Sequence, residues 1–468
     1  MKLLFVVKDI DTEHLGIMML SSLLKQAGHQ VDVAEADLRK IYRKLRLGKY
    51  DIVAYSCTSP FFSFYLEINR KIKKDFNIFS IFGGPHPTLL PEIINHQSID
   101  CICRGEGEYA LLDLVEAMSS RQDFHDIENL WVKTERVVHK NNLRPLICNL
   151  DALPFPDRDL FYYNETVDRG KMHVLTTRGC LYDCSYCIHA FYDKLYNGQE
   201  KMLRRRSVDN VIKEIREVKE KADIRFIMFE DDLFTSSPEW LKEFSLQYKK
   251  YIKLKFFCYI RPDMVTASII RELKEAGCAS VSMGFESASE RLRNDILKRN
   301  MSKKTMINAA RLVKENNIRL KTTNIIGIPT SSLEDDIDTL KINIQCKVDY
   351  AGAKLLMPYP KTEAREFSEK INVLTDKNYE LTQKSSPFSF KERKDKRARE
   401  NLSKLFAITV EFPFLLSFTR KIIYSPLGLI YAYVNLLWDG YCSFSRLYPT
   451  DFKGFWAGAR KHLRKFRD

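Results

Sequence analysis

Short apolar runs alternate with amphipathic stretches along the first 125 residues of the chain. The runs read as strands, and the stretches between them carry apolar residues at helical spacing. Five strands that alternate with helices predict a doubly wound parallel sheet. We expect strands at residues 3–7, 31–34, 52–56, 78–82 and 101–103, with helices at 15–27, 38–47, 61–74, 89–96 and 109–119.

A second series of strands and helices runs from about residue 170 to residue 358. Six strand–helix units are fewer than a closed eight-stranded barrel requires, so the pattern predicts a partial barrel with its chemistry at the carboxyl ends of the strands. We expect strands at residues 173–176, 225–229, 255–259, 280–284, 320–326 and 351–356, with helices that include 208–219, 267–276, 304–315 and 333–344.

The two series together predict an α/β protein of several domains, which agrees with a length of 468 residues. A polar and then turn-rich connector separates the series, and the residues after the barrel lose the strand–helix rhythm. We expect a doubly wound, Rossmann-like domain at 1–125, a linker at 126–168, a partial (β/α)6 TIM barrel at 169–365 and a mainly helical C-terminal extension at 366–468.

Turns that follow three of the first-domain strands are candidates for ligand binding. They contain Ser56, the pair Gly83–Gly84, and the pair Gly105–Glu106. Ligands of open α/β sheets bind outside the carboxyl ends of the strands, so these turns predict a binding site. Glycine-rich turns at strand ends also occur for structural reasons alone.

The formal net charge of +14 is concentrated near the end of the chain. From Lys391 onward there are 16 Lys or Arg residues against 7 Asp or Glu. A basic excess is typical of proteins that meet nucleic acid, anionic substrates or anionic membranes. Because the excess lies in the extension, we treat it as a property of that extension and expect no nucleic acid partner.

Three of the eleven cysteines form one tight group, Cys180, Cys184 and Cys187. This grouping indicates metal ligation in a reducing compartment rather than a disulfide framework. Thiolates are the usual ligands of iron–sulfur clusters, and the C-x3-C-x2-C spacing lets each one reach a different iron. One iron would then stay open to an external ligand. A zinc site completed by His189 is the alternative.

The segment Thr177-Arg-Gly-Cys-Leu-Tyr-Asp-Cys-Ser-Tyr-Cys187 resembles the cluster loop of the radical S-adenosylmethionine (SAM) superfamily. The resemblance implies that Cys180, Cys184 and Cys187 hold a [4Fe–4S] cluster and that SAM chelates the open iron. An electron from a donor such as flavodoxin or ferredoxin would then cleave SAM to methionine and a 5′-deoxyadenosyl radical.

Motifs at later strand ends follow the order of the same family, and they imply contacts to SAM. The residues concerned are Tyr186 near the adenine, Asp231 near the amino end, Arg261 at the carboxylate, Glu286 with Ser287 at the ribose or amino group, and Ile326 beside the adenine.

Residues 1–125 resemble the cobalamin-binding domain of class B radical SAM methylases and of the anaerobic oxidative cyclases. The matching segments are LGIMML at 15–20, GGPHPT at 83–88 and RGEGE at 104–108, and the linker motif LPFPDR at 153–158 also belongs to this architecture. The resemblance implies cobalamin as a third cofactor, bound at Ser56, Gly83, Gly84, Gly105 and Glu106. The signature D-x-H-x-x-G departs here, because Glu13 stands at the histidine position and His14 follows one residue late.

The resemblance favours a cobalamin-dependent methyltransferase that acts on an unactivated carbon of a small-molecule or lipid-like substrate. An oxidative cyclase or carbon–carbon coupling enzyme with the same cofactors is the alternative, and a noncatalytic cobalamin- or SAM-sensing module is a third reading. A tRNA methylthiotransferase is disfavoured, because no second cysteine triad or RNA-binding domain is recognisable.

The first residues do not form a secretory signal, so we expect a cytoplasmic protein. Residues 422–438 are too short and too interrupted to span a bilayer, which requires about 20 apolar residues. Their neighbourhood is nevertheless rich in aromatic and basic residues, which suits peripheral contact with an anionic membrane at its inner face. A helical cap that buries the aromatic residues against the barrel is the alternative.

Overall fold

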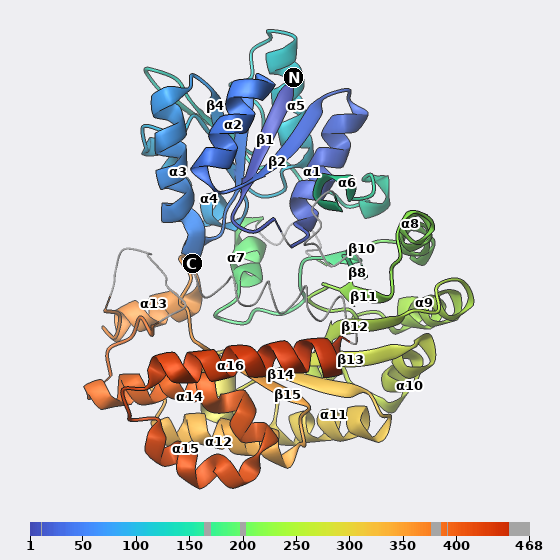
Figure 1. Ribbon diagram of the computed structural model, residues 1–468, viewed down its shortest axis with the longest axis vertical. Coiled ribbons are helices and arrows are strands. Elements are labelled where there is room, and N and C mark those ends of the chain that lie inside the picture. Colours follow the sequence, from blue (N-terminus) through green and yellow to red (C-terminus); the bar gives the residue numbers. More distant parts are fainter. Residues whose placement is uncertain (11, 163–169, 197–202, 376–384, 391, 449–468) are drawn as a thin grey trace. The chain divides into compact units, whose positions relative to one another are not determined.

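The computed structural model describes residues 1–10, 12–162, 170–196, 203–375, 385–390 and 392–448 (Figure 1). The chain divides into two compact units. The first holds Met1–Val167 together with Phe191–Met202, and the second holds most of the remaining chain.

The first unit contains a seven-stranded sheet with the order β2-β1-β3-β4-β5-β6-β7. The first five strands in the chain are parallel, as predicted, and β6 and β7 pair antiparallel. These last two strands lie within residues 126–168, so the sheet continues into the expected linker. The strands are β1 (Lys2–Val7), β2 (Gln30–Glu35), β3 (Ile52–Ser56), β4 (Phe79–Gly83), β5 (Cys101–Cys103), β6 (Leu130–Lys133) and β7 (Val138–Lys140).

Helices cover both faces of this sheet (Figure 1), which explains why its central strands β1 and β3 are mostly apolar. Leu3 and Phe5 of β1 join the core under α1 (Leu15–Gln26) and α5 (Glu108–Ser119). Leu4 and Val6 point to the opposite core, under α2 (Leu38–Gly48) and α3 (Phe62–Asp75). Consecutive residues of β1 therefore point to opposite faces of the sheet and pack in different hydrophobic cores.

The helix expected at residues 89–96 is not continuous. A short helix α4 (Pro85–Leu89) is followed by a 3-10 turn over Pro91–Asn95. Proline lacks the N–H that continues a helix and clashes with the preceding turn, so Pro91 starts a new element instead. The sequence prediction weighted the apolar spacing above this proline.

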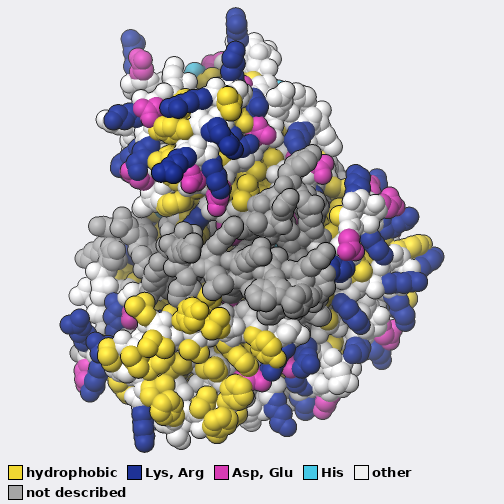
Figure 2. All heavy atoms as spheres, in the orientation of Figure 1, with side chains coloured by type: hydrophobic (Ala, Val, Ile, Leu, Met, Phe, Trp, Pro, Cys, Tyr) yellow, Lys and Arg dark blue, Asp and Glu magenta, His cyan; other side chains and the backbone are white. Residues whose placement is uncertain are grey.

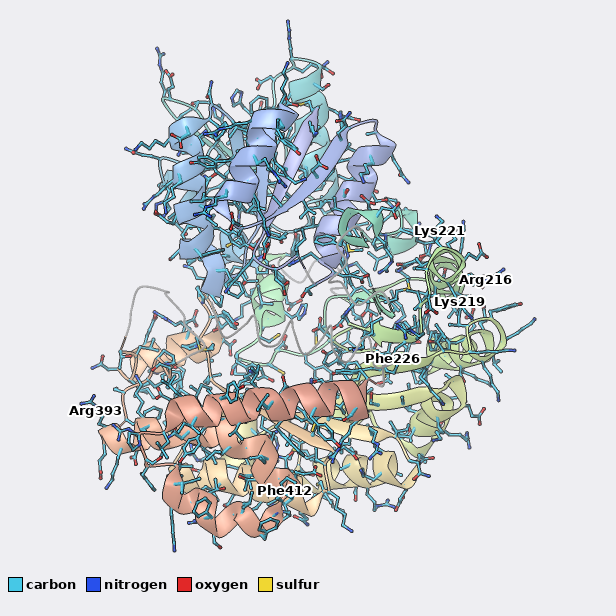
Figure 3. All side chains as sticks on the ribbon, viewed as in Figure 1. Arg216, Lys219, Lys221, Phe226, Arg393 and Phe412 are labelled. Carbon is cyan, nitrogen blue, oxygen red and sulfur yellow. The ribbon has the colours of Figure 1, made fainter. Side chains whose placement is uncertain are left out.

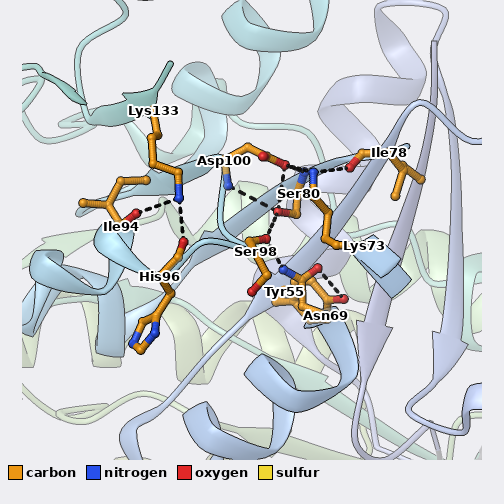
Figure 4. A network of polar contacts seen from close by, with 10 residues as sticks. All are labelled: Tyr55, Asn69, Lys73, Ile78, Ser80, Ile94, His96, Ser98, Asp100 and Lys133. Atoms are coloured by element: carbon orange, nitrogen blue, oxygen red, sulfur yellow. Dashed lines mark hydrogen bonds and ion pairs between the residues drawn. The ribbon is translucent and has the colours of Figure 1, made fainter. Parts of the chain in front are cut away.

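Polar side chains tie α3 to the amino ends of β4 and β5 (Figure 4). The Asp100 carboxylate accepts hydrogen bonds from the Ser80 amide and from Lys73 Nζ, each at 2.7 Å. The Ser98 carbonyl accepts from Ser80 Oγ at 2.9 Å and from the Asn69 side chain. The network lies at the sheet edge opposite the glycine turns, so it fixes the strands without occupying the predicted ligand edge.

The second unit contains a six-stranded parallel sheet with the order β15-β14-β13-β12-β11-β8. The predicted six-unit partial barrel is thus confirmed. Its strands are β8 (Lys171–Val174), β11 (Phe226–Phe229), β12 (Lys255–Ile260), β13 (Cys278–Glu286), β14 (Arg319–Ile326) and β15 (Tyr350–Leu355).

Each main helix of this barrel begins directly after a serine or threonine. The side chains of these N-cap residues accept a backbone N–H of the first turn, which satisfies a donor that the helix itself leaves unpaired. The helices are α8 (Val208–Lys221), α9 (Pro238–Tyr251), α10 (Ala267–Ala276), α11 (Lys303–Glu315) and α12 (Leu333–Gln345), and the caps are Ser207, Ser237, Thr266, Ser302 and Ser332.

The C-terminal extension is helical, as predicted, and it forms part of the barrel rather than a separate domain. Its helices are α13 (Glu363–Lys370), α14 (Arg393–Glu411), α15 (Leu416–Ile422) and α16 (Gly428–Cys442). Leu402 and Phe406 of α14 join the main barrel core. Near the end of the described chain, the Tyr448 ring lies 5.0 Å from Phe257, and Ser280 Oγ donates to the Leu447 carbonyl at 2.6 Å.

One buried ion pair anchors α14 to the barrel. Arg399 Nε lies 2.9 Å from Asp336 Oδ2, and both side chains are almost fully buried. The other carboxylate oxygen accepts the Gly327 amide at 3.2 Å, at the carboxyl end of β14. Arg399 belongs to the basic stretch that begins at Lys391, yet its side chain is buried. The extension therefore supports the turn that follows β14.

Replacing Arg399 by alanine would leave the Asp336 carboxylate buried without its partner. We expect the free energy of unfolding to fall by about 3–5 kcal/mol, as for other broken buried pairs. Arg420→Ala is the matched control, because Arg420 pairs with Glu334 at 2.7 Å where both side chains are nearly half exposed. In denaturant titrations, the free energy of unfolding of Arg420→Ala should be lower than that of the wild type by less than about 1 kcal/mol. Equal losses for the two variants would contradict the anchoring role.

The same variant should show a defined pH dependence. Burial raises the pKa of Asp336 from 3.8 to about 7, against the opposing attraction of Arg399. The folded state therefore holds this proton more tightly than the unfolded state, so the carboxyl favours folding at low pH and costs stability as the pH rises through 7. Without Arg399 the ionised carboxylate has no partner, so the stability difference between wild type and Arg399→Ala should be larger at about pH 8 than at about pH 6.

Candidate functional site

The cysteine loop begins at a turn that one buried carboxylate holds in place. Oδ1 of Asp231 accepts from the Thr176 amide at 2.8 Å, the Thr176 hydroxyl at 2.9 Å and the Thr177 hydroxyl at 2.6 Å, and it also accepts the Thr177 amide. Asp231 is fully buried. Strand β8 ends at Val174 instead of the predicted residue 176, because the Thr176 amide donates to this carboxylate.

A half-buried arginine supports the same turn from the other side. Arg205 donates to the Thr176 hydroxyl at 3.3 Å and to the Leu233 carbonyl at 3.0 Å, and its guanidinium lies 4.4 Å from the centre of the Trp240 ring. Burial raises the pKa of Asp231, and the threonine hydrogen bonds and Arg205 oppose that rise. Carboxylate and guanidinium together fix the turn from which the cysteines project.

The loop itself is fastened at its second half. Ser185 Oγ donates to the Ile296 carbonyl at 2.6 Å, and the Ser185 carbonyl accepts the Ala364 amide at 2.9 Å. The Cys187 amide donates to the Cys184 carbonyl at 3.0 Å, which closes a turn between two of the predicted ligands. The positions of these two thiols are therefore set by backbone contacts at both flanks.

The three thiols lie near one another and near one guanidinium. Burial raises the pKa of Cys187 to about 12, and the neighbouring Cys184 and Cys180 add to the rise. Arg261 Nη1 donates to Cys184 Sγ at 3.4 Å, and its guanidinium lies 3.5 Å from the centre of the Tyr182 ring. Arg261 therefore places a positive charge beside one of the three sulfurs.

The donor set fits a cluster in which each thiolate binds a different iron. Within the described residues, no three His, Cys, Asp or Glu side chains converge as ligands of a single metal ion. His189, the fourth ligand in the zinc alternative, places its Nε2 2.8 Å from Asp232 Oδ2. Three cysteines of one loop are the donor set that a cluster with one open iron requires.

A buried network follows at the ends of β13 and β14. The Tyr186 hydroxyl donates to Glu286 Oε1 at 3.3 Å and accepts from Arg299 Nη1 at 3.1 Å. Thr323 also donates to Glu286 Oε1 at 3.3 Å. Glu286 follows an irregularity in the β13–β14 register and has a left-handed φ of 60°. Burial raises the pKa of Glu286, and Arg299 opposes that rise. Tyr186 and Glu286, predicted separately, thus belong to one site.

Four predicted SAM-binding residues have structural partners that the sequence did not reveal. Asp231 holds the cysteine loop, and Ser287 Oγ accepts the Ser289 amide at 3.2 Å within a turn. Arg261 contacts Cys184 and pairs with Asp263 at 2.8 Å. Ile326 is fully buried in the barrel core.

The residue that shares a face with the network is Ile325 rather than Ile326. Ile325 packs in a small apolar cluster with Tyr186 and Ile328. Side chains two residues apart in a strand point to the same face of the sheet. Thr323, which donates to Glu286, and Ile325 are two residues apart in β14, so they share a face. That alternation was the signal that could have identified Ile325. Arg299 carried no sequence signal, because it is one basic residue within a polar stretch.

The turns predicted in the first unit meet at one edge of its sheet. Ser56 is exposed and pairs with Gly83 across β3 and β4. Gly84 has φ = 91°, and a Cβ there would lie 3.0 Å from the Cys57 amide nitrogen, so only glycine fits. Thr88 Oγ1 donates to the Gly84 carbonyl at 2.9 Å and accepts the Gly105 amide at 3.0 Å.

Glu106 differs from the other predicted residues of this edge. Its Oε2 accepts the Ile147 amide at 2.8 Å, and its carbonyl accepts the Asn129 side chain at 2.7 Å. These contacts fasten the segment that follows β7. The exposed Ser56 and the side-chain-free backbone at Gly83 and Gly84 fit the close approach of a large planar cofactor. The Tyr196 hydroxyl lies against Gly105, where a Cβ would be 2.2 Å from it, and the Glu106 carboxylate is engaged in the fold.

The departure at Glu13 has a structural explanation. Glu13 Oε2 lies 2.9 Å from Arg158 Nη1, and both side chains are buried. Arg158 ends the LPFPDR segment at 153–158, so the pair joins the turn before α1 to that segment. His14 Nε2 lies 2.8 Å from the Asp9 carbonyl oxygen at the start of α1. The position that carries histidine in the signature therefore holds an ion pair here.

Comparison with known proteins agrees with both units. The profile of the radical SAM superfamily matches residues 174–342, and that of the B12 binding domain matches residues 1–115. A Pyrococcus horikoshii protein named an uncharacterized methyltransferase is 30% identical over 383 residues, which cover 78% of this chain and 80% of that protein. The anaerobic magnesium-protoporphyrin IX monomethyl ester cyclase of Rubrivivax gelatinosus is 25% identical, over 78% of this chain and 68% of the cyclase.

Solved structures share the fold. TsrM of Kitasatospora setae, a radical SAM methyltransferase solved with cobalamin and a [4Fe-4S] cluster, has a TM-score of 0.65 and 19% identity, covering 80% of this chain and 79% of TsrM. The cobalamin-dependent SAM radical enzyme OxsB has a TM-score of 0.69 and 16% identity, covering 100% of this chain and 80% of OxsB.

The chain belongs to the radical SAM superfamily, and a B12 binding domain precedes its barrel in the sequence. Its cofactors are accordingly a [4Fe–4S] cluster, SAM and cobalamin.

The Asp231 geometry makes a specific prediction for the cysteine loop. Asp231→Ala leaves the buried donors of Thr176 and Thr177 unpaired, at a cost of about 1–3 kcal/mol for each group. We expect the iron bound after anaerobic reconstitution to fall by at least about half, measured as iron per folded chain. Asp231→Asn keeps an acceptor oxygen and is the matched control, which should retain most of the iron. If Asp231→Ala bound as much iron as the wild type, Asp231 would not be needed to hold the turn before the cysteine loop.

Proposed function

We propose that this chain is a cobalamin-dependent radical SAM methyltransferase that acts on an unactivated carbon of a small-molecule or lipid-like substrate. The observation that carries the proposal is the presence, in one chain, of a fastened three-thiol loop and a B12 binding domain. The relative at 30% identity, named a methyltransferase, supports the same reaction. A reducing compartment, the cytoplasm, and an electron donor such as flavodoxin or ferredoxin suit this chemistry.

In this proposal Cys180, Cys184 and Cys187 are the cluster ligands. When bound, the cluster, SAM and cobalamin supply reductive cleavage of SAM and a transferable methyl group. Arg261 donates to Cys184 Sγ and is held by Asp263, so its charge acts on the cluster side of the site. A hydrogen bond to a ligand sulfur lowers the energy of the more negative, reduced cluster, which makes reduction easier.

The Tyr186–Glu286–Arg299 network is the proposed SAM-facing surface. Glu286 and Arg299 are buried, and Ile325 packs beside Tyr186 at the same strand ends. A buried polar network with an apolar flank holds a ligand in one orientation and excludes water from it. These properties suit a cofactor whose cleavage produces a reactive radical.

An oxidative cyclase is the second candidate, favoured by the likeness to the Rubrivivax gelatinosus cyclase over 78% of this chain. The two reactions differ in the by-products of SAM. Methylation consumes one SAM as methyl donor and cleaves another, so it yields S-adenosylhomocysteine and 5′-deoxyadenosine, whereas cyclisation yields no S-adenosylhomocysteine. The accepting carbon gains a methyl group in exchange for the hydrogen that the radical removes.

Product analysis tests the proposal. Reconstituted protein, reduced and supplied with SAM and metabolite extract, should form S-adenosylhomocysteine with 5′-deoxyadenosine and one product heavier by a methylene unit, measured by mass spectrometry. Combined replacement of Cys180, Cys184 and Cys187 by alanine should abolish these products. Cys148→Ala is the control, because Cys148 is exposed and lies outside the loop. 5′-Deoxyadenosine without S-adenosylhomocysteine would favour the cyclase.

Cobalamin binding is tested at Gly83. A Cβ there would be 3.7 Å from Cys103 Cβ, an ordinary contact, so a small side chain leaves the fold intact. Gly83→Val should cut bound corrinoid at least about tenfold in absorbance titrations, because the added methyl groups occupy the space that the cofactor approaches. Gly83→Ala and the melting temperature of the apoprotein control for folding. Unchanged corrinoid content in a folded Gly83→Val protein would remove this edge as the binding site.

A further inference from the structure

Exposed hydrophobic side chains gather on the C-terminal helices of the second unit. Figure 2 shows apolar atoms concentrated where Figure 1 places α15 and α16. Of 17 large hydrophobic residues exposed in the described chain, 10 lie between residues 412 and 441. These are Phe412, Phe414, Phe418, Tyr424, Leu427, Leu429, Ile430, Tyr433, Leu437 and Tyr441, which we call the apolar face.

The apolar face lies on the solvent-facing side of α15, α16 and the segments that precede them, and the opposite side of α16 packs against the protein. Tyr431 and Cys442 of α16 are buried, and the Tyr431 hydroxyl donates to the Ile422 carbonyl at 3.3 Å. On the outer side Leu429 is 86% exposed and Ile430 is 56% exposed. Asp439 is the only charged residue of this 15-residue helix. The helices therefore pack against the barrel, as in the capping alternative, but the aromatic residues of their outer side stay exposed.

Apolar patches of this extent are rare on monomeric proteins and mark interaction surfaces. None of the helices that the structure describes is long and apolar enough to cross a bilayer. A surface that rests on a bilayer needs only an apolar side that enters the boundary between headgroups and acyl chains by about 5–10 Å. Tyrosine, tryptophan and phenylalanine suit that boundary, because their rings are apolar and two of them carry a polar tip.

The charge around the face favours an anionic surface. Residues 391–468 carry 16 Lys or Arg against 7 Asp or Glu. Arg393 at the start of α14 and Lys421 at the end of α15 are exposed, and Figure 3 shows Arg393 and Phe412 at the two ends of α14. A symmetric dimer through this face would bring two such positive extensions together, at a repulsive cost, whereas anionic headgroups neutralise them.

We propose that the apolar face docks this protein on the surface of an anionic bilayer, with the rings of α15 and α16 in the headgroup layer and the flanking cations at phosphates. The inference deepens the proposed function and rests on it only for the substrate, because an enzyme docked in this way gains direct access to a lipid-like acceptor.

Vesicle flotation tests the docking. Wild-type protein should float with vesicles of phosphatidylcholine mixed with phosphatidylglycerol, much less with phosphatidylcholine alone, and less as salt rises. The double variant Leu429→Glu with Ile430→Glu should bind at least about tenfold more weakly, because two apolar side chains lose their burial. Leu47→Glu and Leu246→Glu are matched controls, since these leucines are 81% and 65% exposed on α2 and α9. Both should bind as wild type does.

Two outcomes would overturn the proposal. One is equal flotation of the wild type and the double variant, with unchanged melting temperatures. The other is a dimer that light scattering detects, that the double variant abolishes, and that does not bind vesicles. Reductive cleavage of SAM in solution, measured on the same variants, should be unchanged. A failure of docking is therefore distinguishable from a failure of the proposed chemistry.

Discussion

The second unit depends on one buried carboxylate at the start of its cysteine loop. Asp231 Oδ1 accepts four hydrogen bonds from Thr176 and Thr177, and Arg205 supports the same turn. An oxygen that accepts from four donors in a buried site favours one conformation of the turn, because any other would leave buried donors unpaired. The turn from which the three cysteines follow is thereby fixed by contacts within the protein.

Two buried ion pairs also hold turns in place elsewhere in the chain. The Arg399–Asp336 pair ties the C-terminal extension to the end of β14, and the Glu13–Arg158 pair ties the turn before α1 to the segment at 153–158. Each pair fixes a turn at the carboxyl end of a sheet, where ligands of such folds bind. The extension therefore contributes to the barrel site as well as presenting the apolar face.

The sequence predicted the elements well where periodicity was strong and the site less well where tertiary partners decide. All six barrel strands and the five parallel strands of the first unit follow from apolar runs. The cysteines and Tyr186 follow from local spacing. The roles of Asp231 and Arg261 do not, because their partners Thr176 and Cys184 lie 55 and 77 residues away in the chain. The strands β6 and β7 were missed because they span only four and three residues, too few to show a clear alternation.

The central claim is that three thiolates hold a cluster with one iron open to SAM. Mössbauer spectroscopy of the anaerobically reconstituted protein, recorded before and after SAM addition, tests it most directly. The account predicts about four irons per chain and a changed signal at one of them when SAM binds. A cluster whose spectrum SAM leaves unaltered, or a chain that takes up zinc in place of iron, would contradict the account.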